Sequence, residues 1–372
     1  MSKAAELAKI GEVATNSQIG GRRNLVINGA MQISQRATSA TGVGATNEAY
    51  PTLDRFNFTT TSAGRFTMTQ TADGPTGFAN CMKLECTTVD TAISASEALI
   101  LQTKFEGQDV QQLMYGSSSA QPITVSFYVK GNASATYTLE WRNEEDGRNT
   151  GKTFNVTTDW TRVSITFTGD TAGAAVDDDS THAFTLGIWL HGGTTFSGGT
   201  FVENTWHATN NIRIGDSQTS FFDSTNRTFF LTGLQIELGN QATPFEHRSF
   251  GEEENLCKRY FIKHKAAAPY ERFALGTNVT TDDAAFLFKF YPAMRGIPTL
   301  TIGTLSHLCV TDADGSNEAI GTAPVIDTAA DSTLGVIVYC ADIAGDTLTA
   351  GEASYLAAAD NVNAFLAFDS EL

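Results

Sequence analysis

The chain has 372 residues, enough for two or three domains with separate cores. It carries 24 Lys and Arg against 41 Asp and Glu, a net charge of −17, which argues against a protein that binds nucleic acid through its phosphates. Its 33 Gly and 24 Phe with only 8 Pro suit β-strands joined by turns and exclude a collagen-like fibre.

The first 23 residues are predicted to be an attachment segment, with a short amphipathic helix over 2–14 and a Gly-rich joint after it. Leu7, Ile10 and Val13 supply a weak apolar stripe. A helix this short is not stable alone in water, so it must dock either on its own subunit or on a larger particle. It lacks the apolar core of a signal peptide, and we expect synthesis in the cytoplasm and no membrane insertion.

From residue 24 to 250, apolar and polar residues alternate, which is typical of half-buried strands. Turn residues separate the runs, and the pattern predicts an antiparallel two-sheet sandwich, most simply a jelly roll. In the last run Phe230 is expected on the same face as Leu234 and Ile236. The expected strands are 122–130, 135–142, 161–168, 183–190 and 226–238, and the residues expected to be buried are Phe127, Leu139, Trp141, Ile165, Leu186, Ile188 and Ile236.

Residues 251–265 are predicted to form a connecting helix, because acidic residues fill the first turn and basic residues the last. A β-rich unit over 266–372 follows, and its length suits a small sandwich. The predicted fold class is therefore all-β: a jelly-roll β-sandwich, a short helix and a second, smaller C-terminal β-sandwich, preceded by a short N-terminal helix. The strands expected in the last unit are 284–290, 298–305, 308–311, 335–340 and 364–368.

Neither a metal site nor a cofactor is expected. The five cysteines are odd in number and lack a metal-binding spacing, so we interpret them as small buried hydrophobes. His182, His191 and His207 would form a metal site only if neighbouring strands brought them together, and we interpret them as polar loop or sheet positions. The Asp312–Glu318 loop lacks the glycine and the distal glutamate of a calcium loop and is interpreted as a turn.

The outer face of the predicted strands carries residues suited to contact a sugar. Tyr128, Arg142 and Trp189 point away from the hydrophobic interior, as does Glu140. Exposed aromatic rings can stack on sugar rings while polar neighbours bond the hydroxyls. We favour the alternative that loops or a neighbouring subunit cover these rings. Glu140 with Glu144–Asp146 would suit glycoside cleavage, but acidic residues are ordinary at a hairpin tip, so no catalytic residue is assigned and the protein is not expected to be an enzyme.

The blocks NLVINGAMQISQRATS, YPTLDRF, PITVSFYVKG, GIWLHGG, TGLQIELG, ATPFE and CKRYF occur in this order within residues 24–263. The ordered series resembles bacteriophage tail-fibre and minor virion structural proteins that carry a jelly-roll domain like a carbohydrate-binding module. KFYPAMRGIPTLTIG, at 289–303, resembles a stretch found near the end of many such fibres.

This resemblance implies a virion protein, assembled in the bacterial cytoplasm as a homotrimer. Its first 23 residues would attach to other tail or capsid proteins, and its C-terminal unit would contact a host cell-surface glycan or protein, without nucleic acid. The candidate contacts in that unit are Tyr270, Arg272, Phe273 and the Asp312–Glu318 loop, an aromatic–arginine cluster and a polar turn. A capsid head fibre or decoration protein and a glycan-cleaving fibre enzyme are the alternatives.

Overall fold

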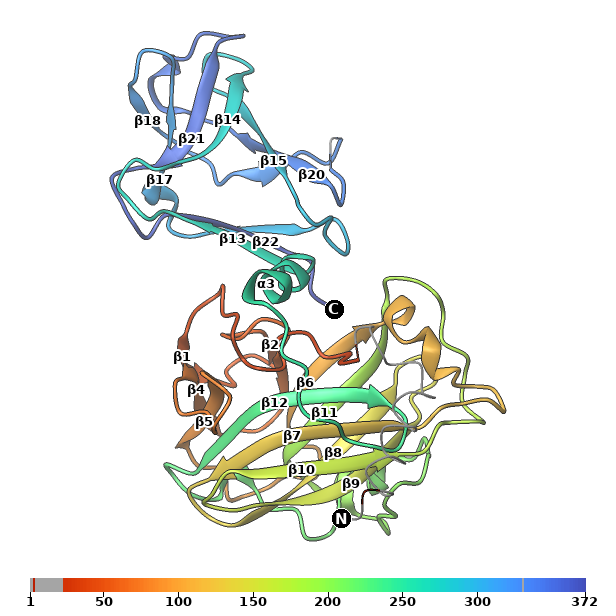
Figure 1. Ribbon diagram of the computed structural model, residues 1–372. Helices are drawn as coiled ribbons and strands as arrows, with labels where there is room; N and C mark the ends of the chain where they lie inside the picture. The colour runs from red at the N-terminus through yellow and green to blue at the C-terminus, as the bar shows by residue number, and fades with distance from the viewer. Residues whose placement is uncertain (1–2, 4–22, 330) are drawn as a thin grey trace. The chain divides into compact units, whose positions relative to one another are not determined.

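The computed structural model describes Lys3 and residues 23–329 and 331–372 (Figure 1). The expected attachment contacts Leu7, Ile10 and Val13 lie outside these residues. The chain divides into two compact units, Met1–Glu253 with Leu372 (unit 1) and Glu254–Glu371 (unit 2). No helix in the described part of the chain is long and apolar enough to cross a membrane.

Unit 1 is built from two six-stranded antiparallel sheets that lie face to face in a jelly roll (Figure 1). The strand order in sheet A is β1 (Ser39–Val43), β4 (Arg65–Thr71), β5 (Cys81–Thr88), β12 (Thr228–Leu238), β7 (Ile123–Gly131) and β10 (Thr161–Phe167). The order in sheet B is β2 (Glu48–Ala49), β3 (Asn57–Thr60), β6 (Ala98–Glu106), β11 (His182–Gly192), β8 (Ala135–Asn143) and β9 (Asn149–Val156).

The inner faces of the two sheets share one hydrophobic core, and the predicted register is confirmed. Phe127 is fully buried whereas its neighbour Tyr128 is half-buried, as alternation along β7 requires. Trp141 of β8 stacks on Phe184 of β11 with ring centroids 4.6 Å apart. The seven residues expected in the core are all no more than 3% exposed: Phe127, Leu139, Trp141, Ile165, Leu186, Ile188 and Ile236.

One expected alternation is wrong, in β12. The pairing of β12 with β7 shifts between Thr232 and Gln235, where Gly233 takes a φ of +62°. Such a bulge reverses which side chains face inward. Phe229 before the bulge and Leu234 after it are therefore buried, and Phe230 lies on the outer face, with Lys130 Nζ 4.8 Å from its ring centroid.

Residues 23–24, near the start of unit 1, are hydrogen-bonded to residues 246–253 at its end. The amides of Arg23 and Asn24 donate to the Glu246 carboxylate at 3.1 and 2.8 Å. Arg248 donates to the Asn24 carbonyl and, at 3.1 Å, to Glu253. We call these five residues the junction cluster. Asn24 begins the first of the sequence blocks described above and Glu246 ends the block ATPFE, and the cluster joins the two ends of unit 1 across more than 200 residues of chain.

The connecting helix is shorter than expected. Helix α3 covers Phe250–Lys258, and the predicted helical residues after it form strand β13 (Phe261–Lys265) instead. Phe261 and Ile262 are aromatic and β-branched, which favours a strand, and they pair with Asp369 and Phe368. Unit 2 therefore begins within α3 rather than at residue 266.

Unit 2 is a smaller β-sandwich, as predicted, with one hydrophobic core between a three-stranded and a seven-stranded sheet. The five expected strands are all present. Most of them begin and end within one or two residues of the expected positions, whereas the strand expected at 298–305 is shorter and covers only Thr299–Ile302. The order in sheet C is β13, β22 (Phe365–Asp369) and β16 (Thr299–Ile302). The order in sheet D is β18 (Asn317–Ala319), β17 (Leu308–Thr311), β21 (Ala353–Ala358), β14 (Arg272–Asn278), β15 (Ala284–Lys289), β20 (Gly335–Cys340) and β19 (Val325–Ile326).

Candidate ligand-binding site

An open pocket of about 520 Å³ in unit 2 unites two of the regions predicted to contact a host. Tyr270, just before β14, forms one part of it, and Asn317 of the Asp312–Glu318 loop forms another. We call it the Tyr270 pocket. Its lining consists of Tyr270, Leu305, Ser306, Leu308, Cys309, Asn317, Ala319, Ile320, Ala359 and Asp360.

Backbone contacts hold the segments of this pocket together. The carboxylate of Glu271 accepts from the amides of Ala267 and Ala268, at 2.5 and 3.2 Å, which fixes the turn that carries Tyr270. The Ala358 amide donates to the Glu271 carbonyl at 2.8 Å. Both Tyr270 and Asp360 have a positive φ, 59° and 51°. Residues other than glycine adopt this backbone conformation only where the surrounding structure imposes it.

The pocket combines an apolar wall with polar groups that lack protein partners. Tyr270 is 50% exposed, and Leu308 and Ile320 form a buried floor. Asn317 uses its Oδ1 to accept from Thr311 at 2.6 Å. Among the described residues, neither the Asn317 amide nitrogen nor the Asp360 carboxylate takes part in a hydrogen bond. A donor, an acceptor and an aromatic ring in one open pocket suit a ligand with both an apolar face and hydroxyl groups.

Cys309 contributes to the wall rather than to chemistry. Its Sγ donates to the Ala358 carbonyl at 3.5 Å, and burial raises the pKa of the thiol. A thiol held protonated is a poor nucleophile and a poor metal ligand. The lining therefore suits binding rather than covalent catalysis.

Arg272 and Phe273 do not join Tyr270 in the pocket, although the sequence predicted the three as one cluster. The Arg272 guanidinium lies over the ring of Tyr355, 4.0 Å from its centroid. Phe273 packs against the core of unit 2. Strand alternation after residue 271 separates the three side chains.

Trp189 is not exposed, and its assignment as a sugar contact is wrong. It does leave the main core as predicted, but the segment after β11 folds back over sheet B and covers it. Phe196 lies 4.9 Å from its ring, and the Arg213 guanidinium lies 4.8 Å from it. Arg213 also bonds both carboxylate oxygens of Glu140, at 2.7 and 2.6 Å, so this carboxylate is committed to a buried ion pair.

Tyr128 and Arg142 lie on outer faces of the sandwich but are only partly accessible. The ring of Tyr128 packs on Phe78, 5.3 Å away, and Phe78 in turn contacts Phe245. Arg142 forms an ion pair with Glu144 at 3.0 Å. These contacts agree with the alternative that loops cover the outer rings.

Sequence inspection missed most of the pocket lining. Leu305 and Ser306 come from the turn η5 (Leu305–His307), and Ala359 and Asp360 follow β21. They lie about fifty residues apart in the chain and have no motif. The one local signal was the set of polar turn residues at Asp312–Glu318, which did supply Asn317.

No protein-family profile matches the chain, and no curated protein sequence matches it. Among solved structures, a CBM4 carbohydrate-binding module aligns with a TM-score of 0.31 and 12% identity over 57% of this chain and 97% of that one. The enzymatically active domain of tailspike protein 4 from bacteriophage CBA120 aligns with a TM-score of 0.31 and 11% identity, over 58% of this chain but only 21% of that one. A family 61 carbohydrate-binding module in complex with β-1,4-galactotriose aligns with a TM-score of 0.29 and 7% identity, over 58% of this chain and 99% of that one. Similarities of this size carry no argument about what this chain binds.

Proposed function

We propose that the chain is a bacteriophage virion structural protein of the tail-fibre type, which binds a host-surface glycan through the Tyr270 pocket. The observation that carries the glycan part is the pocket itself, with a half-exposed tyrosine beside groups that make no hydrogen bond to the part of the chain that the structure describes. The virion part rests on the ordered sequence blocks over residues 24–263. On this proposal the protein acts by binding and not by catalysis.

The charge near the pocket favours a neutral glycan. Asp360 lines the pocket, and Asp312 and Asp314 lie in the turn between β17 and β18, next to Asn317. The whole chain carries a net charge of −17. Carboxylate or phosphate groups on a glycan would be repelled at this surface, whereas uncharged hydroxyls would find both donors and acceptors.

The proposal includes a homotrimer whose N-terminal segment attaches to the virion. Unit 2 exposes apolar side chains that suit contact with further copies of the chain: Leu287 is 52% exposed, Tyr291 76% and Leu334 64%, and the three line one hollow of about 520 Å³. Sedimentation equilibrium of the full chain tests the trimer. A protein lacking residues 1–22 should sediment like the full chain but fail to join particles.

Binding of the full chain to polysaccharide isolated from the host surface tests the glycan part. We expect Tyr270→Ala to weaken binding about tenfold, since it removes the stacking ring. The control is Leu275→Ala, which deletes another exposed apolar side chain of unit 2, outside both the Tyr270 pocket and the hollow at Leu287, Tyr291 and Leu334. Neutral polysaccharides should bind, and acidic ones should bind more weakly.

Two outcomes would contradict the proposal. Equal affinity of the Tyr270→Ala protein and the unchanged protein would remove the pocket from host contact. Absence of binding to host cells, together with many copies of the chain on the capsid surface in electron micrographs, would favour the decoration protein instead.

A further inference from the structure

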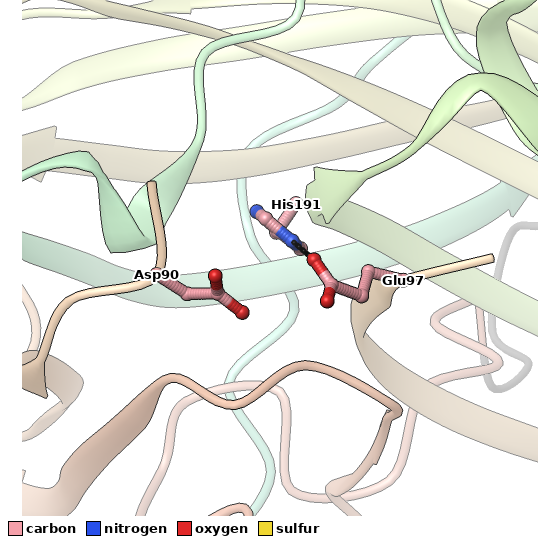
Figure 2. A group of neighbouring side chains, drawn as sticks. All are labelled: Asp90, Glu97 and His191. Atoms are coloured by element: carbon pink, nitrogen blue, oxygen red, sulfur yellow. Dashed lines mark ion pairs between the residues drawn. The ribbon is translucent and has the colours of Figure 1, made fainter. Parts of the chain in front are cut away.

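Three side chains of unit 1, outside the proposed glycan pocket, converge where β6 begins and β11 ends. Asp90 follows β5, Glu97 directly precedes β6, and His191 is the next-to-last residue of β11. Figure 2 shows the two carboxylates and the imidazole turned toward one another. One ligand atom from each lies within 4.8 Å of the other two, and His191 Nε2 is 3.5 Å from Glu97 Oε2.

His191 is fully buried and has one nitrogen without a hydrogen bond. Its Nδ1 lies 2.8 Å from the hydroxyl of Ser220, which fixes the ring. Its Nε2 lies 3.5 Å from Glu97 Oε2, longer than an ordinary hydrogen bond, and no other residue that the structure describes bonds it. Burying a polar atom without a hydrogen-bond partner costs free energy. A ligand that binds Nε2 would therefore stabilise the fold.

The two carboxylates add negative charge that no neighbouring cation balances. Asp90 is 8% exposed and accepts from Ser62 Oγ at 2.6 Å and from the Ala63 amide at 2.9 Å. In the described part of the chain, no Lys or Arg forms an ion pair with Asp90 or Glu97.

We propose that Asp90, Glu97 and His191 bind one Zn²⁺ ion. A neutral imidazole and two carboxylates form a donor set that zinc accepts, and their two charges balance the ion, whereas calcium and magnesium prefer oxygen ligands alone. In a tetrahedral zinc site, ligand atoms lie about 3.3 Å apart, so the 3.5 Å separation of Nε2 and Oε2 already fits and the widest pair must close by at most about 1.5 Å. Ser220 orients the imidazole from outside the site, and a water molecule takes the fourth position.

The ion would anchor an exposed loop. Residues 91–96 connect two of the ligands, and all six are exposed. The same loop is joined to the chain after β11, because the Gly193 amide donates to the Glu97 carbonyl and the Thr195 amide to the Ala95 carbonyl, both at 2.9 Å. Zinc would therefore hold β5, β6 and β11 together at one end of the sandwich. Among the described residues, no other group of three or more His, Cys, Asp or Glu lies close enough to hold a metal.

The test is zinc binding by the full chain after treatment with a chelator. We expect one zinc ion per chain by elemental analysis, and a melting temperature that rises by several degrees on addition of Zn²⁺ but not of Ca²⁺. Cobalt substituted for zinc should give an absorption spectrum without a thiolate charge-transfer band, which separates this site from adventitious binding to the five cysteines.

Glu97→Gln and Asp90→Asn should each weaken zinc binding about tenfold or more, because each removes a charged ligand of nearly the same shape. The matched control is Glu85→Gln, a carboxylate of the same unit that pairs with Lys83 and should leave zinc binding unchanged. Unchanged zinc affinity in the Glu97→Gln protein would overturn the proposal, as would a melting temperature that does not respond to Zn²⁺, or a thiolate band in the cobalt spectrum.

Discussion

Neighbouring side chains on one strand of unit 1 have opposite roles in its stability. Phe127 is fully buried and packs edge-to-face on Phe154, 5.1 Å away between centroids. Tyr128 lies on the other face of the same strand, partly accessible, where its ring contacts Phe78. The difference follows from alternation along β7 and does not depend on residue type, since both side chains are aromatic.

We predict that Phe127→Ala costs about 3–5 kcal/mol of unfolding free energy, through lost burial and the cavity left behind. Tyr128→Ala should cost about 1–2 kcal/mol, because a partly exposed ring loses less. Urea unfolding of the two variants, followed by the fluorescence of the buried tryptophans, measures both values. Equal losses would mean that the strand register is wrong by one residue.

The residue scale is also where sequence inspection missed the most contacts between side chains. His191 was considered together with His182 and His207, because histidines were the visible metal ligands. Its neighbours in the structure are instead Asp90 and Glu97, two ordinary-looking acidic residues in a chain with 41 of them. Nothing in their spacing reveals the contact, since strand pairing between β6 and β11 creates it.

At the scale of elements, long strands with regular alternation were predicted well. β7, β8, β11 and β12 each begin and end close to the expected residues, because one buried face repeats over many positions. β13 was missed, because only five residues pair and their charge pattern continues that of the preceding helix. The bulge in β12 was missed because Gly233 alone marks it.

The ends of unit 1 depend on a buried ion pair rather than on regular structure. Arg248 and Glu253 have side chains only 4% and 8% exposed and lie 3.1 Å apart. Glu253 also accepts from the Asn28 amide at 2.5 Å, and Arg248 donates to the Val26 carbonyl at 3.0 Å. Loss of either partner would leave a buried charge without its counter-ion.

Arg248→Ala should therefore destabilise unit 1 by about 3–5 kcal/mol. The matched control is Arg142→Ala, whose partner Glu144 is 25% exposed, so that the same deletion should cost at most about 1 kcal/mol. Thermal unfolding of the two proteins compares these losses. A similar small shift for both variants would show that the junction cluster is not needed to close the sandwich.

At the scale of the whole molecule, both units contain half-buried histidines whose pKa lies below its ordinary value. In unit 1, burial lowers the pKa of His182 to about 4, against the opposing charge of Glu144, and lowers that of His207 as well. In unit 2, burial lowers the pKa of His264, and Lys258 adds to the effect. These side chains must therefore take up a proton when the chain unfolds in mild acid.

The sign of the effect follows from proton linkage. Between pH 6.5, the ordinary pKa of histidine, and about 4, the unfolded chain binds a proton at position 182 that the folded chain does not. The stability that neutral His182 provides is complete above pH 6.5 and falls as the pH is lowered to about 4.

We predict that His182→Gln, which can keep the 2.8 Å contact with Thr185, loses less stability between pH 7.5 and 4.5 than the unchanged protein. Urea unfolding midpoints at the two pH values measure the difference. The control is His247→Gln, at an exposed position, because it keeps the same carboxylates, which titrate in the same range. An equal drop in midpoint for the unchanged protein and His182→Gln would show that this histidine does not contribute to acid lability.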